Sequence, residues 1–309
     1  MTADAHQLAR ARRAVFGPPI LGAIGAVLLV VGALGLDRTD SSASPDENTP
    51  TSEVQTPGTL IPAKRGYDVV TADAHMFRNG DIAANAVLVP NLPKGDRVVA
   101  ATAAHVGGGG AAWLVTATGH VLDWGTPHYG GLPAGKPHAT VVGIAATTDG
   151  AGYWIATADG NVVAFNAPSY PRASGAGRAA PIVGIAAAAG GGYWLADAKG
   201  NVYNFGPAKD FRKFGDAKFA TRVVTIATAN LGYMLLTADG ALHGYATPVF
   251  GDLSKTGSHP DVVSVATSDD GGYWILTSDG SVQQFENALQ GSSSDVVSLR
   301  TRAVAIIEI

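Results

Sequence analysis

The chain contains no cysteine, which excludes thiol catalysis, thiolate metal sites and disulfide bonds together. Charged side chains are also scarce, at 15% of the 309 residues, and the formal net charge is -4. A nucleic-acid-binding domain normally carries a clear excess of basic residues, so the composition argues against a nucleic-acid partner. What the chain does have is 40 glycines and a sequence that repeats itself.

The repeat has a period of about 40 residues, which is typical of propellers and other repeat architectures. Its clearest copy reads VVGIAATTDGAGYWIATADGNVVAF from Val141, and two others read IVGIAAAAGGGYWLADAKGNVYNF from Ile182 and VVSVATSDDGGYWILTSDGSVQQF from Val262. Each copy opens with small and β-branched residues, continues with a run centred on an aromatic residue, and ends with a third run that closes on another aromatic residue. This pattern predicts three antiparallel strands.

The turns between these runs complete the predicted unit. Asp-Gly pairs such as Asp159-Gly160 separate the second run from the third and predict two-residue hairpins of type I′. A fourth run with proline and an aromatic residue, such as residues 168–170, predicts an edge strand. Four short antiparallel strands in about 40 residues match one blade of a β-propeller.

The two ends of the array indicate how the ring closes. The first copy starts at Gly66 with a second run and lacks the opening run, whereas Ala303–Ile309 is an opening run with nothing after it. Six opening runs and six second runs can be counted. We therefore expect an all-β, six-bladed propeller over residues 66–309, in which the carboxy-terminal strand completes the first blade.

The segments GYWIATADGNVVAF, GYWLADAKGNVYNF and GYWILTSDGSVQQF resemble the tandem GYW repeats of exported and cell-envelope proteins of actinobacteria, which are regarded as β-propeller-like. The resemblance covers residues 66–309. It implies a propeller fold and an envelope location, and it carries no shared catalytic residues. Asp68 and Met234 depart from the pattern, because both stand where the tryptophan belongs.

The amino-terminal residues predict a membrane anchor. Residues 1–13 contain three arginines, and residues 14–36 form an apolar segment whose uncharged part, Phe16–Leu36, would span roughly 31 Å as a helix. Basic residues before the segment favour a cytoplasmic amino terminus and an extracytoplasmic remainder, as in a signal anchor. A cleaved signal peptide with its site near residues 33–35 is the alternative. Residues 37–65 are rich in Ser, Thr and Pro, which predicts a disordered linker.

The search for chemistry yields few candidates. His75 and His120 hold equivalent places after their hairpin turns, where solvent-exposed turn histidines are expected, and no metal or cofactor is predicted. The candidate binding residues are Asp68, His75, Arg78 and Asn79, which concentrate polar changes in the first blade. Either this blade has diverged for function or its packing is relaxed at the seam of the ring.

These observations favour a membrane-anchored, extracytoplasmic propeller that serves as a binding or scaffold module for an envelope protein or a cell-wall polymer. No catalytic motif is found, so an enzyme is not expected. Two alternatives stay open: an enzyme of lactonase or lyase type with its site at the channel mouth, and a sensor or accessory subunit of a membrane complex.

Overall fold

The computed structural model describes residues 66–80, 86–104, 110–171, 180–211, 219–269, 271–286, 299 and 301–308. All of them belong to one unit, Thr59–Ile309. The predicted cytoplasmic segment, transmembrane helix and linker, residues 1–65, lie outside the described residues. Within the described ranges, no helix is long and apolar enough to cross a membrane.

The described residues form six antiparallel sheets, which we name A to F. Sheet A has the order β19-β1-β2-β3, with strands Ala303–Glu308, Gly66–Thr71, His75–Gly80 and Ala86–Leu88. Sheets B to F have three consecutive strands each. Sheet B contains β4 Val98–Ala104, β5 Ala111–Thr116 and β6 Val121–Trp124, and sheet C contains β7 Val141–Ala146, β8 Tyr153–Thr157 and β9 Val162–Phe165. Sheet D contains β10 Ile182–Ala187, β11 Tyr193–Asp197 and β12 Val202–Phe205; sheet E contains β13 Val223–Ala229, β14 Gly232–Thr237 and β15 Leu242–Tyr245; and sheet F contains β16 Val262–Thr267, β17 Tyr273–Thr277 and β18 Val282–Phe285.

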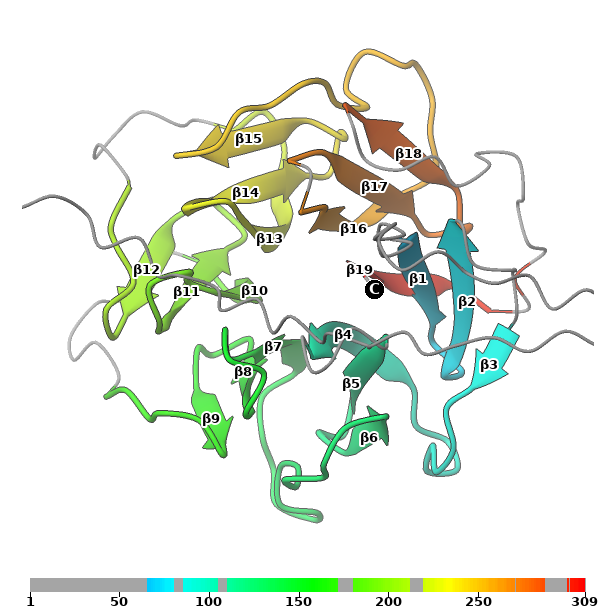
Figure 1. Ribbon diagram of the computed structural model, residues 1–309, viewed down its shortest axis with the longest axis vertical. Helices are drawn as coiled ribbons and strands as arrows, with labels where there is room; N and C mark the ends of the chain where they lie inside the picture. Colours follow the sequence, from blue (N-terminus) through cyan, green and yellow to red (C-terminus); the bar gives the residue numbers. More distant parts are fainter. Residues whose placement is uncertain are drawn as a thin grey trace, which may run out of the picture. The chain divides into compact units, whose positions relative to one another are not determined.

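The sheets are arranged in a closed ring. The innermost strands touch one another in the order β4, β7, β10, β13, β16 and β19, and β19 in turn touches β4 (Figure 1). Small residues suit this position because the strands crowd together there: a Cβ added to Gly184 of β10 would lie 3.2 Å from Ile226 of β13. The arrangement is that of a six-bladed β-propeller, as the repeat predicts.

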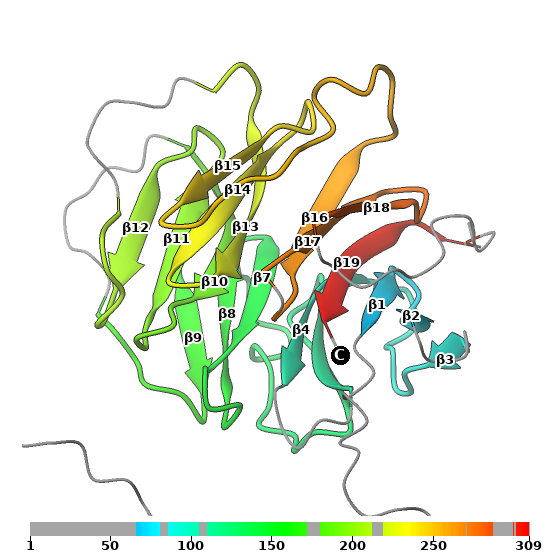
Figure 2. The ribbon, with the colours of Figure 1, turned by 45° about the horizontal axis from the view of Figure 1, so that its top comes forward.

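The expectation that the carboxy-terminal strand completes the first blade is confirmed. Strand β19 pairs antiparallel with β1, with Tyr67 opposite Glu308 and Val69 opposite Ile306. Figure 2 shows β19 between the sheet of β16 to β18 and strand β1. A hydrogen bond of 2.5 Å from Thr301 Oγ1 to Asp73 Oδ1 adds a side-chain link next to this pairing.

The prediction of four-stranded blades is wrong for sheets B, C and E, where the run expected to form the fourth strand is described and the sheet has three strands. In sheets D and F part of the corresponding segment, residues 212–218 and 287–298, lies outside the described residues. The proline-containing runs at residues 127–129, 168–170 and 248–250 are not strands. Proline has no N–H to donate to a ladder. The run instead supplies a carbonyl to the tryptophan of the second strand of the same sheet: Trp113 Nε1 of β5 donates to the carbonyl of Pro127 at 3.0 Å, and Trp154 Nε1 of β8 donates to that of Pro168 at 2.8 Å.

The hairpin turns also differ from the predicted type I′. Of the Asp159-Gly160 pair only Gly160 has a positive φ, 73°, and Thr157 N donates to the carbonyl of Asn161, which makes a three-residue loop. This is a type I turn followed by a left-handed glycine. The aspartate is held by the threonine two residues before it, as in the 2.6 Å bond from Thr237 Oγ1 to Asp239 Oδ1, and this bond favours the type I geometry.

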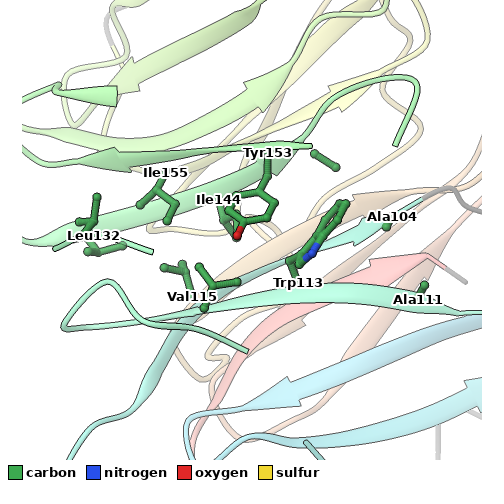
Figure 3. Packing of buried hydrophobic residues seen from close by; sticks show 11 residues of the cluster. Ala104, Ala111, Trp113, Val115, Leu132, Ile144, Tyr153 and Ile155 are labelled. Atoms are coloured by element: carbon green, nitrogen blue, oxygen red, sulfur yellow. The ribbon is translucent and has the colours of Figure 1, made fainter. Parts of the chain in front are cut away.

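Aromatic pairs fill the spaces between neighbouring sheets, as expected for core packing. The tryptophan of one second strand packs on the tyrosine of the next sheet, and both are buried. Figure 3 shows this arrangement for Trp113 and Tyr153, whose ring centroids lie 5.0 Å apart. The same contact recurs at Trp154–Tyr193, Trp194–Tyr233 and Trp274–Tyr67. Large rings at such offset or tilted distances dominate the stability of a core.

Candidate functional site

We call the contact between two successive sheets a seam, and two of the six seams lack the Trp–Tyr pair. In the register of its sheet, Asp68 of β1 takes the tryptophan position and Ala112 of β5 takes the tyrosine position, so the A/B seam has neither ring. In the E/F seam Met234 replaces the tryptophan while Tyr273 is kept. We call these two the irregular seams, because the other four seams all contain the Trp–Tyr contact.

The A/B seam contains an ion pair between a buried aspartate and a partly exposed arginine. Asp68 is 1% exposed and stands directly opposite Arg78 across the β1–β2 hairpin. Both carboxylate oxygens accept from Arg78: Nε lies 3.2 Å from Oδ1, and Nη2 lies 3.3 Å from Oδ2. The planar guanidinium group suits this two-point contact.

Arg78 reaches across the seam to the backbone of sheet B. A Cβ added to Gly110, just before β5, would lie 2.6 Å from Arg78 Nη2, and Gly110 has a φ of +64°. Glycine is favoured there because a side chain would strain the backbone at this φ, and the guanidinium group would have to shift to make room for it. The arginine fills part of the space that two aromatic rings occupy in the regular seams.

Burial dominates the electrostatics of Asp68. Burial raises the pKa of its carboxyl group above the usual value, although the hydrogen bonds and the positive charge of Arg78 oppose this rise. With both of its oxygens bonded to one arginine, the carboxylate is suited to hold Arg78 in place.

The other two predicted site residues do not join this pair. His75 begins β2 at the end opposite to Arg78, and its Nδ1 lies 3.2 Å from Asp73 Oδ2. Asn79 is paired with Tyr67 in the β1–β2 ladder. The structure thus brings together Asp68 and Arg78, and it places His75 at the start of β2, directly after the hairpin turn.

Asp73 next to His75 makes the stability of this turn sensitive to acid. Burial alone would raise the pKa of Asp73, but hydrogen bonds from Thr301, Thr71 and His75 lower it to about 2. A carboxyl group whose folded pKa lies below its unfolded value stabilises the fold above the unfolded pKa, and this contribution is lost as the pH falls.

We expect Asp73→Asn to lower the melting temperature at pH 6 and to reduce the loss of stability between about pH 4 and 2. Thermal melts at a series of pH values test this, and identical pH profiles for both proteins would contradict it.

The described residues contain no group of three or more His, Cys, Asp or Glu side chains placed to hold a metal ion. His120 occupies the place equivalent to His75, because the backbone N–H of each histidine donates to the hydroxyl oxygen of the threonine four residues earlier, Thr71 for His75 and Thr116 for His120.

The E/F seam carries exposed apolar side chains. Phe250 stacks on Tyr273 with ring centroids 6.3 Å apart and is 46% exposed, Val249 is 38% exposed, and Leu231 is 74% exposed. Asn230 Nδ2 donates to Thr247 Oγ1 at 3.2 Å, which ties the turn of Leu231 to the segment of the other two residues. We call Leu231, Val249 and Phe250 the E/F patch.

Sequence reasoning missed the E/F patch, although Met234 was visible as a departure. Phe250 corresponds to Tyr129 and Phe211, which lie 6.2 and 6.0 Å from Trp113 and Trp194 and are only partly exposed. Because Met234 replaces the tryptophan in sheet E, Phe250 stacks on Tyr273 without a tryptophan ring beside it. The other signal is Leu231 itself, an apolar residue in a turn that other copies build from glycine and polar residues.

No family model matches the chain, and no curated protein matches it. Solved structures with a similar course of the chain include a protein of unknown function from Bacteroides caccae, with a TM-score of 0.49, 11% identity, and coverage of 80% of this chain and 99% of that one. A chain of a mitotic checkpoint complex has a TM-score of 0.49 at 13% identity, covering 84% and 98%. A chain of a nidogen/laminin complex has a TM-score of 0.49 at 10% identity, covering 79% and 98%. At such identities the likeness concerns the fold, and no residue or role is transferred from these proteins.

Proposed function

We propose that this chain is a binding module whose propeller captures a protein partner through the E/F patch. The observation that carries the proposal is that three apolar side chains, Leu231, Val249 and Phe250, are exposed on two segments that the hydrogen bond from Asn230 to Thr247 joins. Apolar side chains gathered on the surface mark sites of interaction, and loops held by a rigid scaffold are where binding residues concentrate. An apolar patch suits a protein partner better than a cell-wall polymer.

The proposal places the propeller outside the cytoplasm, anchored by residues 14–36, with an envelope protein as the partner. The uncharged segment, the arginines before it and the resemblance to envelope repeat proteins support this location.

The geometry of the A/B seam favours a structural role for Asp68 over a catalytic one. Both oxygens of Asp68 accept from Arg78, so this carboxylate is engaged in positioning. A general acid or base would need to reach a substrate proton directly or through one water molecule.

The test is a crosslinking pull-down from envelope membranes with the full chain as bait. We expect the intact protein to recover a specific partner, and the variant Leu231→Asp/Phe250→Asp to recover at least about tenfold less, since the loss of even one apolar contact of about 1.5 kcal/mol weakens binding about tenfold. Leu88→Asp is the matched control, because Leu88 is 58% exposed but lies on β3 of sheet A. Equal recovery by the double variant and the intact protein would refute the assignment.

A further inference from the structure

We infer that the E/F patch binds a short segment of the partner in which an apolar side chain lies next to a lysine or arginine, with Glu286 as the acceptor for that cation. This inference rests on the proposed function and specifies the chemistry of the partner.

The ring does not need Leu231 in its exposed position. The turn between β13 and β14 contains only Asn230 and Leu231, because Ala229 pairs directly with Gly232. The corresponding turns of sheets C, D and F contain glycines with positive φ, namely Gly150, Gly191 and Gly271. A polar residue would fit this two-residue turn equally well. Because the Leu231 side chain is 74% exposed, it adds little to the packing of the ring.

Glu286 lies beside the patch. It directly follows Phe285, the last residue of β18, whose ring stacks on Tyr273 at 5.2 Å. Tyr273 also stacks on Phe250, so Phe250 and Phe285 contact the same ring and Glu286 is the residue after one of them. Burial raises the pKa of Tyr273, and the negative charges of Asp252 and Glu286 contribute to this rise, in agreement with their proximity.

The charged side chains around the E/F patch are acidic. Among the described residues at this end of sheets E and F, which are 229–232, 245–251, 267–269, 271–273 and 285–286, there is no lysine and no arginine. Glu286 is exposed. A partner that brings a cation next to its apolar side chain would gain an ion pair and would be steered toward this end by charge complementarity.

The size of the patch decides between a second copy of the chain and a short segment. Three partly exposed side chains offer on the order of a few hundred Å², the size of a functional patch on a monomer. A stable interface between two proteins needs about 800 Å² from each partner. The patch therefore suits a single apolar anchor from a short segment rather than a dimer of propellers.

A library of phage-displayed dodecapeptides, selected on the detergent-solubilised full chain, tests the inference. We expect enriched peptides to place Leu, Ile, Phe or Trp within two residues of Lys or Arg. The affinity of such a synthetic peptide, measured by fluorescence anisotropy, should fall about tenfold for Leu231→Asp and for Glu286→Lys.

Selection on the Glu286→Lys protein should instead enrich peptides with Asp or Glu beside the apolar residue. Leu88→Asp should bind like the intact chain, and Leu231→Ser provides a second variant if Leu231→Asp loses cooperative unfolding.

Peptides that bind equally well to Glu286→Lys, or no enrichment over the library, would overturn the inference. Self-association that disappears in Leu231→Asp would also overturn it, because a second copy would then be the occupant. If capture from envelope membranes depends on Leu231 and Phe250 while Glu286→Lys changes neither capture nor peptide choice, the proposed function stands and the charge-paired segment is wrong.

Discussion

Removing residues 303–309 is expected to abolish the cooperative unfolding of the ring. Strand β19 contributes four buried apolar residues, of which Ile306 and Ile307 are 4% and 5% exposed, and it touches β4 and β16 on either side. Its two isoleucines alone account for about 3–6 kcal/mol of burial. The total stability of a typical domain is about 5–15 kcal/mol, so this loss, together with an unpaired β1, leaves little margin.

Differential scanning calorimetry of the intact and truncated chains provides the measurement. A synthetic peptide with the sequence AVAIIEI should restore a cooperative transition to the truncated protein, and a scrambled peptide of the same composition should not. If the truncated protein melts like the intact one, the pairing of β19 with β1 does not close the ring.

The ring of six sheets could be predicted from the sequence because the same pattern of strand-forming runs recurs in each copy. Six copies of the opening run and the split first copy fix the number of sheets and the partner of the last strand, and no single copy has to be interpreted alone. The strand after the third run could not be predicted in this way. Proline with an aromatic residue suits an edge strand and a loop equally, and the outcome depends on the bond from Trp154 Nε1 to the Pro168 carbonyl, a tertiary contact.

The candidate sites likewise divide into a part that the repeat pattern predicts and a part that depends on contacts between sheets. Asp68 was visible because it breaks a repeated apolar position, and its partner Arg78 follows from the register of one hairpin. The E/F patch depends on contacts between sheets, since the exposure of Phe250 reflects the missing ring at Met234. A departure from a repeat can thus be located in the sequence, but whether it creates an ion pair with a buried carboxylate or an exposed apolar surface is decided by the neighbouring sheet.

Arg78→Ala is expected to destabilise the protein by about 3–5 kcal/mol, because it leaves the Asp68 carboxylate buried without its partner. For a domain of this size the loss corresponds to a fall of roughly 10 °C in melting temperature. Arg222→Ala is the matched control, since Arg222 is an exposed arginine just before β13 and such substitutions change stability by about 0.5 kcal/mol or less.

The pH dependence separates the loss of charge balance from the loss of packing. Burial raises the folded pKa of Asp68 above its unfolded value, so stability falls as the pH rises from the unfolded pKa through the folded pKa. Without Arg78 nothing opposes this rise, and the deficit of Arg78→Ala should be greatest at neutral pH and should shrink toward about pH 4. Asp68→Asn/Arg78→Ala should regain most of the deficit at pH 7. A deficit that is independent of pH and persists in the double variant would mean that Arg78 acts by packing against Gly110, and that the charge of Asp68 has no part in holding the A/B seam.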